Sequence, residues 1–148
     1  MRVRMNFGEN AGRSLDGEWG LMPDPMDRCR RQRWWQRQRH EGQWFPSYDD
    51  DAFWPTTVPA AYNRLHPELS YYEGTLVFLK HFDARPAQPE EKAFLHFAGV
   101  ADRCSVFLNG RFLGEHDGGH TGFALEVGEC LADTNRLLVL VECRRQRD

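Results

Sequence analysis

Acidic side chains beside a glycine-rich turn are the first residues in this chain whose types could do chemistry. Glu115 and Asp117 are two positions apart, just before Gly118 and Gly119, so both could lie on one side of an extended strand. Two carboxylates about 5–10 Å apart can divide the roles of general acid and nucleophile or base. Asp-Gly-Gly is also typical of a turn, and we predict that structural role for it. The other acidic candidates are Asp102 and Asp49–Asp51, the latter expected in a solvated loop.

Histidines flank the same turn. His116 and His120 enclose Asp117 with an i, i+4 spacing, which brings two ligands together only on a helix. The two glycines between them disfavour a helix, so we predict no metal site and expect His116 to hold the turn by hydrogen bonding. The cysteines give no zinc signature, because none of them forms a Cys-x-x-Cys pair. Cys104 and Cys143 lie in apolar runs, and we predict that both are buried free thiols.

An arginine-rich segment surrounds two tryptophans. Residues 28–40, RCRRQRWWQRQRH, contain six arginines around Trp34 and Trp35. Cations and stacking rings could bind nucleic acid. However, 17 of the 19 basic residues are arginine, since lysine occurs only at Lys80 and Lys92, and the net charge of −3 opposes nucleic-acid binding. We therefore predict an irregular segment, or a helix of one to three turns, that buries one tryptophan and leaves the arginines in water.

The chain carries no signal for a membrane or for secretion. No apolar run approaches the roughly 18 residues that span a bilayer. The beginning, MRVRMNFGENAGRS, is basic but lacks the apolar region of a secretory signal. If Met1 is the native start, the expected location is the cytoplasm.

A hairpin positions the acidic turn. Asn109-Gly110 lies between two apolar runs and predicts a two-residue type I′ turn, in which both central residues need φ > 0. The expected pairs are Leu108 with Arg111, Phe107 with Phe112 and Val106 with Leu113. Val106, Leu108 and Leu113 would then share one face, with Phe107 and Phe112 on the other. Large apolar groups on both faces predict a strand pair that is covered on both sides.

Short strands are predicted along most of the chain. We interpret residues 1–13 as a disordered or extended polar lead-in and residues 14–148 as one domain. No segment shows a convincing helical period. Pro59 limits the strand near Thr57-Val58 to a sheet edge, and the regular spacing of the strands predicts an antiparallel β-sandwich. The strands are expected around 18–21, 57–58, 75–82, 93–97, 104–108, 112–114, 123–127 and 137–141.

Six short motifs occur in one order between Ser14 and Cys143. They are the opening SLDGEW, Trp54 followed by VPAAYN, the aromatic-x-Gly step Tyr72–Gly74, the hairpin FAGV…VFLNG, the turn GEHDGG and the strand NRLLVLV. Together they resemble the N-terminal sugar-binding domain of glycoside hydrolase family 2, and Arg33–Trp35 with the Gly-Gly turn is most similar to its β-glucuronidase-like branch. The sequence departs from the family at 120–123, where HTGF replaces the usual Tyr followed by Thr-Pro-Phe. The fingerprint residues are Asp16, Gly17, Trp19, Pro59, Asn63, Gly74, Asn109, Gly110, His116, Gly118 and Gly119.

The resemblance implies an all-β, jelly-roll (galactose-binding-domain-like) antiparallel sandwich that ends before the family domain's last strands. It implies a non-catalytic domain of a retaining exo-β-glycosidase, β-glucuronidase- or β-galactosidase-like, that hydrolyses O-glycosyl bonds. In the family an immunoglobulin-like domain and a TIM barrel follow, and the barrel holds the catalytic glutamates. The resemblance therefore places no catalytic residue, cofactor or metal in this chain. The expected partners are a β-glycoside, those missing domains and further copies of the chain, with neither nucleic acid nor membrane.

Contacts with a sugar are expected only at the edge of a substrate pocket. Aromatic rings can stack on pyranose rings, but most of those available here are expected in the core or at a domain interface. Two alternatives stay open, a free-standing carbohydrate-binding module and a purely structural sandwich. The available rings are Trp34, Trp35, Trp44, Trp54, Tyr71 and Tyr72, and the predicted pocket-edge residues are Tyr71, Tyr72, Glu73 and Asp148.

Overall fold

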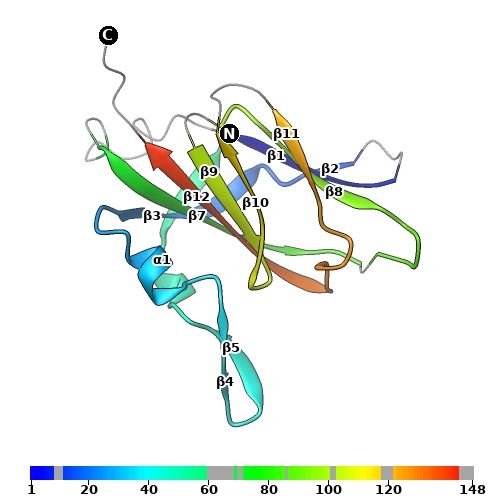
Figure 1. The fold of residues 1–148 in the computed structure, drawn as a ribbon, viewed down its shortest axis with the longest axis horizontal. Coiled ribbons are helices and arrows are strands. Elements are labelled where there is room, and N and C mark those ends of the chain that lie inside the picture. Colours follow the sequence, from blue (N-terminus) through cyan, green and yellow to red (C-terminus); the bar gives the residue numbers. More distant parts are fainter. Residues whose placement is uncertain are drawn as a thin grey trace.

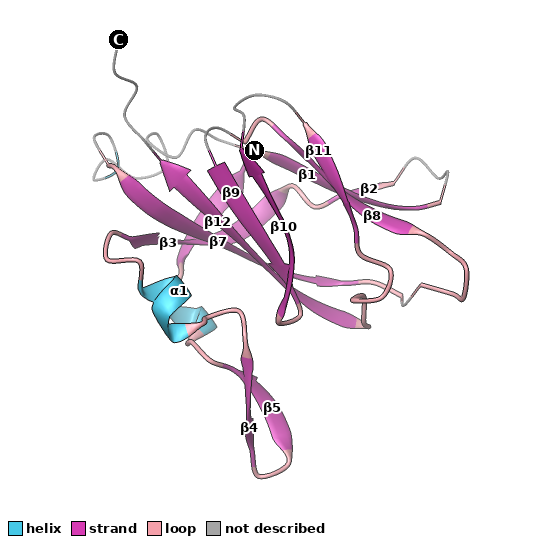
Figure 2. Cartoon of the chain, viewed as in Figure 1, coloured by secondary structure: helices cyan, strands magenta, loops and turns pink. Residues whose placement is uncertain are grey.

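The computed structural model describes residues 1–8, 12–59, 69, 72–85, 87–100, 103–117 and 122–143. Figure 2 shows that strands make up most of the regular structure in these ranges. A short helix, α1 (Arg28–Gln32), and a 3₁₀ turn, η1 (Asp50–Ala52), lie between β3 and β6, and no helix in the described ranges could cross a membrane. The strands are β1 (Arg2–Phe7), β2 (Arg13–Ser14), β3 (Gly17–Asp24), β4 (Arg37–His40), β5 (Gln43–Pro46), β6 (Trp54–Val58), β7 (Gly74–Asp83), β8 (Ala93–Ala98), β9 (Arg103–Leu108), β10 (Arg111–Asp117), β11 (Phe123–Glu126) and β12 (Thr134–Cys143).

Two antiparallel sheets form a sandwich (Figure 1). The smaller sheet has the strand order β11-β8-β1-β2, and the larger has the order β10-β9-β12-β7-β3-β6. The predicted antiparallel sandwich is therefore confirmed, although it has more strands than the sequence pattern indicated. β6 lies at a sheet edge, as predicted from Pro59, and the Val58–Pro59 peptide bond is cis.

The main core lies between the two sheets and follows from simple alternation. On β8, Ala93, Leu95 and Phe97 are buried and the residues between them are more exposed. Successive side chains of a strand point to opposite faces, so this pattern places one face of the smaller sheet against the larger sheet. Leu95 and Phe97 accordingly lie together in the main core.

The lead-in predicted for residues 1–13 is in large part a strand of the sandwich. β1 pairs with β8 along its whole length, from Arg2 opposite Ala98 to Phe7 opposite Ala93. Val3 and Met5 are buried in the main core. Residues Arg2–Phe7 form a paired strand, because the two apolar residues alternate with arginines and fill the inner face of the smaller sheet.

β12 is buried on both of its faces. Leu137, Val139 and Val141 belong to the main core, whereas Leu138 and Leu140 face outward into a second apolar cluster. A strand covered on both sides has a continuous apolar sequence rather than an alternating one. The second cluster exists because the segment between β3 and β6 folds over the outer face of the larger sheet.

The hairpin β9–β10 has the predicted turn but not the predicted register. Asn109 and Gly110 both have positive φ, 52° and 87°. Leu108 pairs with Arg111 and Phe107 with Phe112, but Val106 pairs with Gly114 because a bulge follows Phe112. The predicted pairing of Val106 with Leu113 is therefore wrong. The predicted faces hold, since Leu113 packs on the main core and Phe107 lies in the outer cluster.

Candidate functional site

The segment from Arg28 to Phe53 builds a small second core on the outer face of the larger sheet. Asp24 starts it: its two carboxylate oxygens each accept a 2.8 Å hydrogen bond, one from the backbone N–H of Arg28 and one from that of Cys29. These bonds satisfy amides at the start of α1 that have no partner within the helix. The predicted short helix that buries one tryptophan is confirmed, since Trp34 is 3% exposed.

Aromatic stacking fixes this segment against the sheet. Trp34 stacks on Tyr48 with ring centroids 3.9 Å apart, and it meets the edge of Phe53 at 6.3 Å. Trp35 stacks on Phe107 of β9 at 4.2 Å. The two tryptophans therefore pack as structural residues of the second apolar cluster.

Gly20 of β3 makes room for Phe53. A Cβ atom at Gly20 would lie 2.8 Å from the Cβ of Phe53, closer than two such carbons can approach. The missing side chain lets Phe53 lie directly on the outer face of the sheet, where it is 8% exposed. The turn η1 immediately precedes Phe53 and begins with a cap in which the Asp49 carboxylate accepts from the backbone N–H of Asp51.

A buried ion pair fastens η1 to the sheet, and we call it the latch. Arg136 of β12 is 6% exposed. Its Nε and Nη2 donate three hydrogen bonds of 2.7–3.2 Å to the carboxylate of Asp50. Its Nη1 donates to the carbonyl of Trp34 at 2.7 Å. His81 stands opposite Arg136 in the β7–β12 ladder, and its Nε2 lies 2.7 Å from Asp50 Oδ2, which also accepts from Arg136 Nε. Cross-strand neighbours share a face, so both side chains reach the same carboxylate.

The latch keeps Asp50 ionised. Burial raises the pKa of this carboxyl group, but the hydrogen bonds from His81 and Arg136 and the charge of Arg136 outweigh burial and lower the pKa to about 2. A carboxyl group that acts as a general acid instead needs a pKa raised toward the working pH. The prediction of a solvated loop at Asp49–Asp51 is wrong for Asp50, whose side chain is only 17% exposed.

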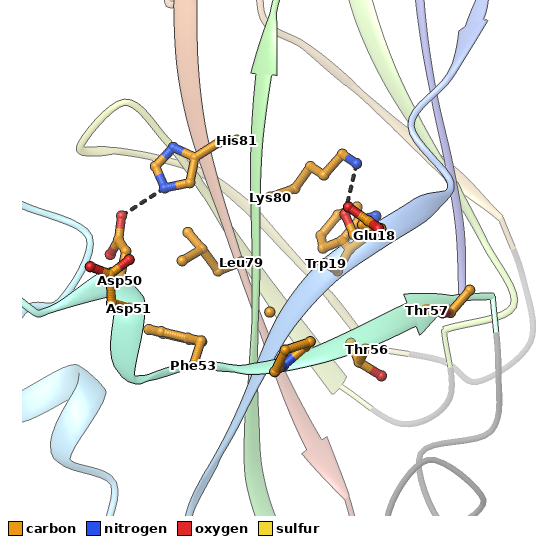
Figure 3. A pocket seen from close by; sticks show the side chains of 12 residues that line it. Glu18, Trp19, Asp50, Asp51, Phe53, Thr56, Thr57, Leu79, Lys80 and His81 are labelled. Carbon is orange, nitrogen blue, oxygen red and sulfur yellow. Dashed lines mark hydrogen bonds and ion pairs between the residues drawn. The ribbon is translucent and has the colours of Figure 1, made fainter.

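A hollow of about 640 Å³ opens beside the latch (Figure 3). We call it the outer hollow. Outward-facing residues of β3, β6 and β7 form its floor, and residues of the η1 region form one wall. Lys80 at its rim donates to the backbone carbonyl of Glu18 at 2.7 Å. Its lining residues are Glu18, Trp19, Gly20, Asp50, Asp51, Phe53, Pro55, Thr56, Thr57, Leu79, Lys80 and His81.

The predicted pocket-edge residues lie elsewhere, at the beginning of β7. The hydroxyl of Tyr72 donates to the carbonyl of Thr75 at 2.6 Å and accepts from the backbone N–H of Asp24 at 3.1 Å. Burial raises the pKa of Tyr72 to about 12. Glu73 is exposed, and the next residue, Gly74, pairs with Cys143 at the end of β12. The structure thus brings Tyr72 and Glu73 near the end of β12, while Tyr71 and Asp148 lie outside the described residues.

The described fingerprint residues have structural contacts. Asp16 accepts from the backbone N–H of Val3 at 2.9 Å, and the indole N–H of Trp19 donates to the carbonyl of Leu15 at 2.8 Å. Gly17 and Gly74 have φ of 120° and 137°, a region that favours glycine. The side-chain amide of Asn109 donates to the Cys130 carbonyl and to Asn135. Asn63, Gly118 and Gly119 lie outside the described residues.

The acidic turn shows side-chain packing rather than a cluster of ligands. His116 stacks on Phe123 with ring centroids 4.3 Å apart, and Glu115 forms an ion pair with Arg103. The turn residues 118–120, which His116 is predicted to hold by hydrogen bonding, lie outside the described residues. No group of three or more potential metal ligands occurs within the described ranges, which exclude Asp102 and His120. All four cysteines are free, and Cys104 and Cys143 are buried, as predicted.

Comparison with known proteins gives the family. The profile of "Glycosyl hydrolases family 2, sugar binding domain" matches residues 12–147. A β-galactosidase of Thermoanaerobacter pseudethanolicus is 31% identical over 108 residues, which cover 68% of this chain and 14% of that protein. A β-glucuronidase of Bacteroides fragilis is 30% identical over 90 residues, or 60% of this chain and 13% of that protein.

Solved structures agree on the fold. The β-glucuronidase of Ruminococcus gnavus in complex with uronic isofagomine superposes with a TM-score of 0.71 at 19% identity, over 94% of this chain and 21% of that one. The β-glucuronidase of Lactobacillus rhamnosus gives 0.66 at 22% identity, again over 94% and 21%. This chain thus spans about a seventh of the length of the curated relatives and a fifth of the solved ones. The profile match over nearly the whole sequence shows that the chain belongs to glycosyl hydrolase family 2. The chain corresponds to the N-terminal sugar-binding domain of that family.

Proposed function

We propose that this chain serves as the non-catalytic domain of a retaining exo-β-glycosidase of the β-glucuronidase or β-galactosidase type. In that enzyme it supports the catalytic barrel and forms one edge of the substrate pocket. The observation that carries the proposal is the family match over residues 12–147, in proteins of which this domain is only a small part.

The carboxylates of the described residues support a non-catalytic role. Asp50 is held by Arg136 and His81 with a pKa of about 2. Glu115 is paired with Arg103. Hydrolysis with retention needs two carboxyl groups that are both available to the sugar, and each of these two is instead engaged by a cationic arginine.

The pocket edge is proposed at the end of the larger sheet where β7 begins and β12 ends. Gly74 and Cys143 are paired there, so Glu73 lies beside the end of β12. Glu73 is exposed, whereas the hydroxyl of Tyr72 is occupied by two backbone groups. Glu73 is therefore the described residue best placed to meet a sugar hydroxyl in the assembled enzyme.

A domain exchange tests the proposal. The corresponding domain of the Thermoanaerobacter pseudethanolicus β-galactosidase is replaced by this chain, and hydrolysis of a nitrophenyl β-galactoside is measured. We expect the chimera to be active, while the enzyme without the domain and this chain alone are both inactive. A folded but inactive chimera, or turnover by this chain alone, would contradict the proposal.

Two further measurements separate the alternatives. In an active chimera, Glu73→Ala should raise KM with little change in kcat, whereas the matched change Glu126→Ala on β11 should alter neither. Calorimetric titration of the 148-residue chain with galactosides and glucuronides should show no binding. Micromolar affinity of the chain alone would instead identify a free-standing carbohydrate-binding module.

A further inference from the structure

A second cavity, of about 250 Å³, lies where β3 ends and α1 begins, and we call it the methionine pocket. An apolar cavity of about 150 Å³ is large enough to hold benzene. The methionine pocket can therefore hold a single six-membered ring with a short side chain. Most of its lining is apolar, and the lining residues are Met22, Pro23, Asp24, Pro25, Met26, Arg28, Gln32, Trp34 and Tyr48.

The walls of the methionine pocket favour an aromatic ring. Trp34 and Tyr48 are stacked with ring centroids 3.9 Å apart, and Trp34 is 3% exposed, so this wall is already fixed in the chain without a ligand. Met22 packs against the same apolar cluster. Methionine side chains adapt to irregular shapes, and their sulfur atoms make favourable contacts with aromatic rings. A flat ring therefore finds matching surfaces on both the methionine and the aromatic walls.

The mouth of the methionine pocket offers hydrogen-bond donors that lack acceptors. Arg28 and Gln32 line the pocket and are exposed. The Gln32 Oε1 accepts from the indole N–H of Trp34 at 2.9 Å, which leaves the N–H groups of the same amide to donate. Arg28 Nη2 lies 4.0 Å from the sulfur of Met26, a weak acceptor, and no carboxylate among the described residues pairs with its guanidinium group.

The charges around the mouth leave an excess of positive charge. Asp24 is 3% exposed, and each of its oxygens already accepts a 2.8 Å hydrogen bond from a backbone N–H at the start of α1. Asp27 is paired with Arg30 at 3.4 Å. Arg31 donates to the carbonyl of Met26, a neutral group, at 2.8 Å. The buried carboxylate of Asp24 is thus outnumbered by the exposed guanidinium groups of Arg28 and Arg31.

From these contacts we propose that the methionine pocket binds a small carboxylate that carries one aromatic ring. The ring lies against Met22 and the Trp34–Tyr48 pair, and the carboxylate accepts from Arg28 and Gln32 at the mouth. A guanidinium–carboxylate hydrogen bond is charge-assisted and stronger than a neutral one. Sugar hydroxyl groups find few partners on apolar walls, so this site is compatible with a chain that binds no free sugar. The proposal is independent of the glycosidase assignment.

The methyl signals of methionine test the site directly in the 148-residue chain. Of the four methionines, Met22 and Met26 line the pocket, while Met5 lies in the main core and Met1 packs against it. In a proton–carbon correlation spectrum assigned with methionine-to-leucine variants, phenylacetate should shift only the Met22 and Met26 signals, and saturably. Phenylacetamide, which loses the charge, should bind about tenfold more weakly. Acetate, which lacks the ring, should bind at least about tenfold more weakly.

Variants of Arg28 test the mouth of the pocket. Arg28→Gln should weaken phenylacetate binding about tenfold and leave phenylacetamide binding unchanged, whereas Arg28→Lys, which keeps the charge, should retain most of the affinity. The matched control is Arg111→Gln, which removes an exposed arginine of β10 outside the pocket and should change neither.

The comparison of phenylacetate with phenylacetamide uses the wild type alone, so it holds even if Arg28→Gln lowers stability. Four results would overturn the proposal: no saturable shift at millimolar phenylacetate, equal shifts of the Met1 and Met5 signals, equal affinity for the acid and the amide, or unchanged phenylacetate binding in a folded Arg28→Gln variant.

Discussion

The latch allows a quantitative prediction for Asp50→Asn. Arg136 is 6% exposed, and the side-chain hydrogen bonds described for it go to Asp50 and to the Trp34 carbonyl. Removing one partner of a buried ion pair costs about 3–5 kcal/mol, because the other charge stays buried without its counter-ion. The Trp34 carbonyl remains available to Nη1, so we expect the lower end, a loss of about 3 kcal/mol in the free energy of unfolding.

Urea unfolding, followed by tryptophan fluorescence and circular dichroism at low protein concentration, measures this loss. The matched control is Asp83→Asn, the same chemical change at an exposed position of β7, which should cost less than about 0.5 kcal/mol. In the background of Arg136→Met, Asp50→Asn no longer leaves a buried guanidinium without its counter-ion. It should then cost much less, with a coupling energy between the two substitutions of about 1–3 kcal/mol. Equal losses of unfolding free energy in Asp50→Asn and Asp83→Asn would refute this prediction.

The same ion pair sets the dependence of stability on pH. The pKa of Asp50 is lowered from 3.8 to about 2, so its contribution is complete above pH 4 and disappears as the pH falls through 2. A shift of this size corresponds to about 2 kcal/mol. The unfolding free energy of the wild type should therefore fall more steeply between pH 4 and 2 than that of Asp50→Asn.

Three further predictions concern single residues. Gly20→Ala should destabilise the chain by about 1–3 kcal/mol in urea unfolding, because the new methyl group overlaps Phe53; Gly128→Ala, whose nearest neighbours are at 3.5 Å, should have little effect and serves as its control. Tyr72→Phe should cost about 1 kcal/mol in the same assay by leaving two backbone groups without their partner, and no loss would contradict the described contacts. With Ellman's reagent at pH 8, Cys130 should be the first thiol to react, since the other three are buried; an unchanged fast phase in Cys130→Ser would refute this.

Local sequence pattern predicts the inner face of the sandwich well. The alternation of Ala93, Leu95 and Phe97 has one physical reading, a strand with a single buried face. The Asn109-Gly110 turn is equally local, because few residue pairs accept two positive φ values. The bulge after Phe112 cannot be predicted from the residues of the hairpin turn alone. Its register depends on how Gly114 meets Val106, where a Cβ on Gly114 would also lie 2.9 Å from Leu125 of the other sheet.

The structure on the outer face of the larger sheet could not be predicted from local sequence patterns. Arg136 appears in the sequence as the one charged residue of the NRLLVLV strand, and Asp50 as the middle of three acidic residues. Their contact spans 86 positions, and nothing near either residue indicates the other. A signal for the β4–β5 hairpin did exist, since Glu41-Gly42 is a turn pair followed by two aromatic residues, Trp44 and Phe45. The arginine-rich composition of the segment obscured it.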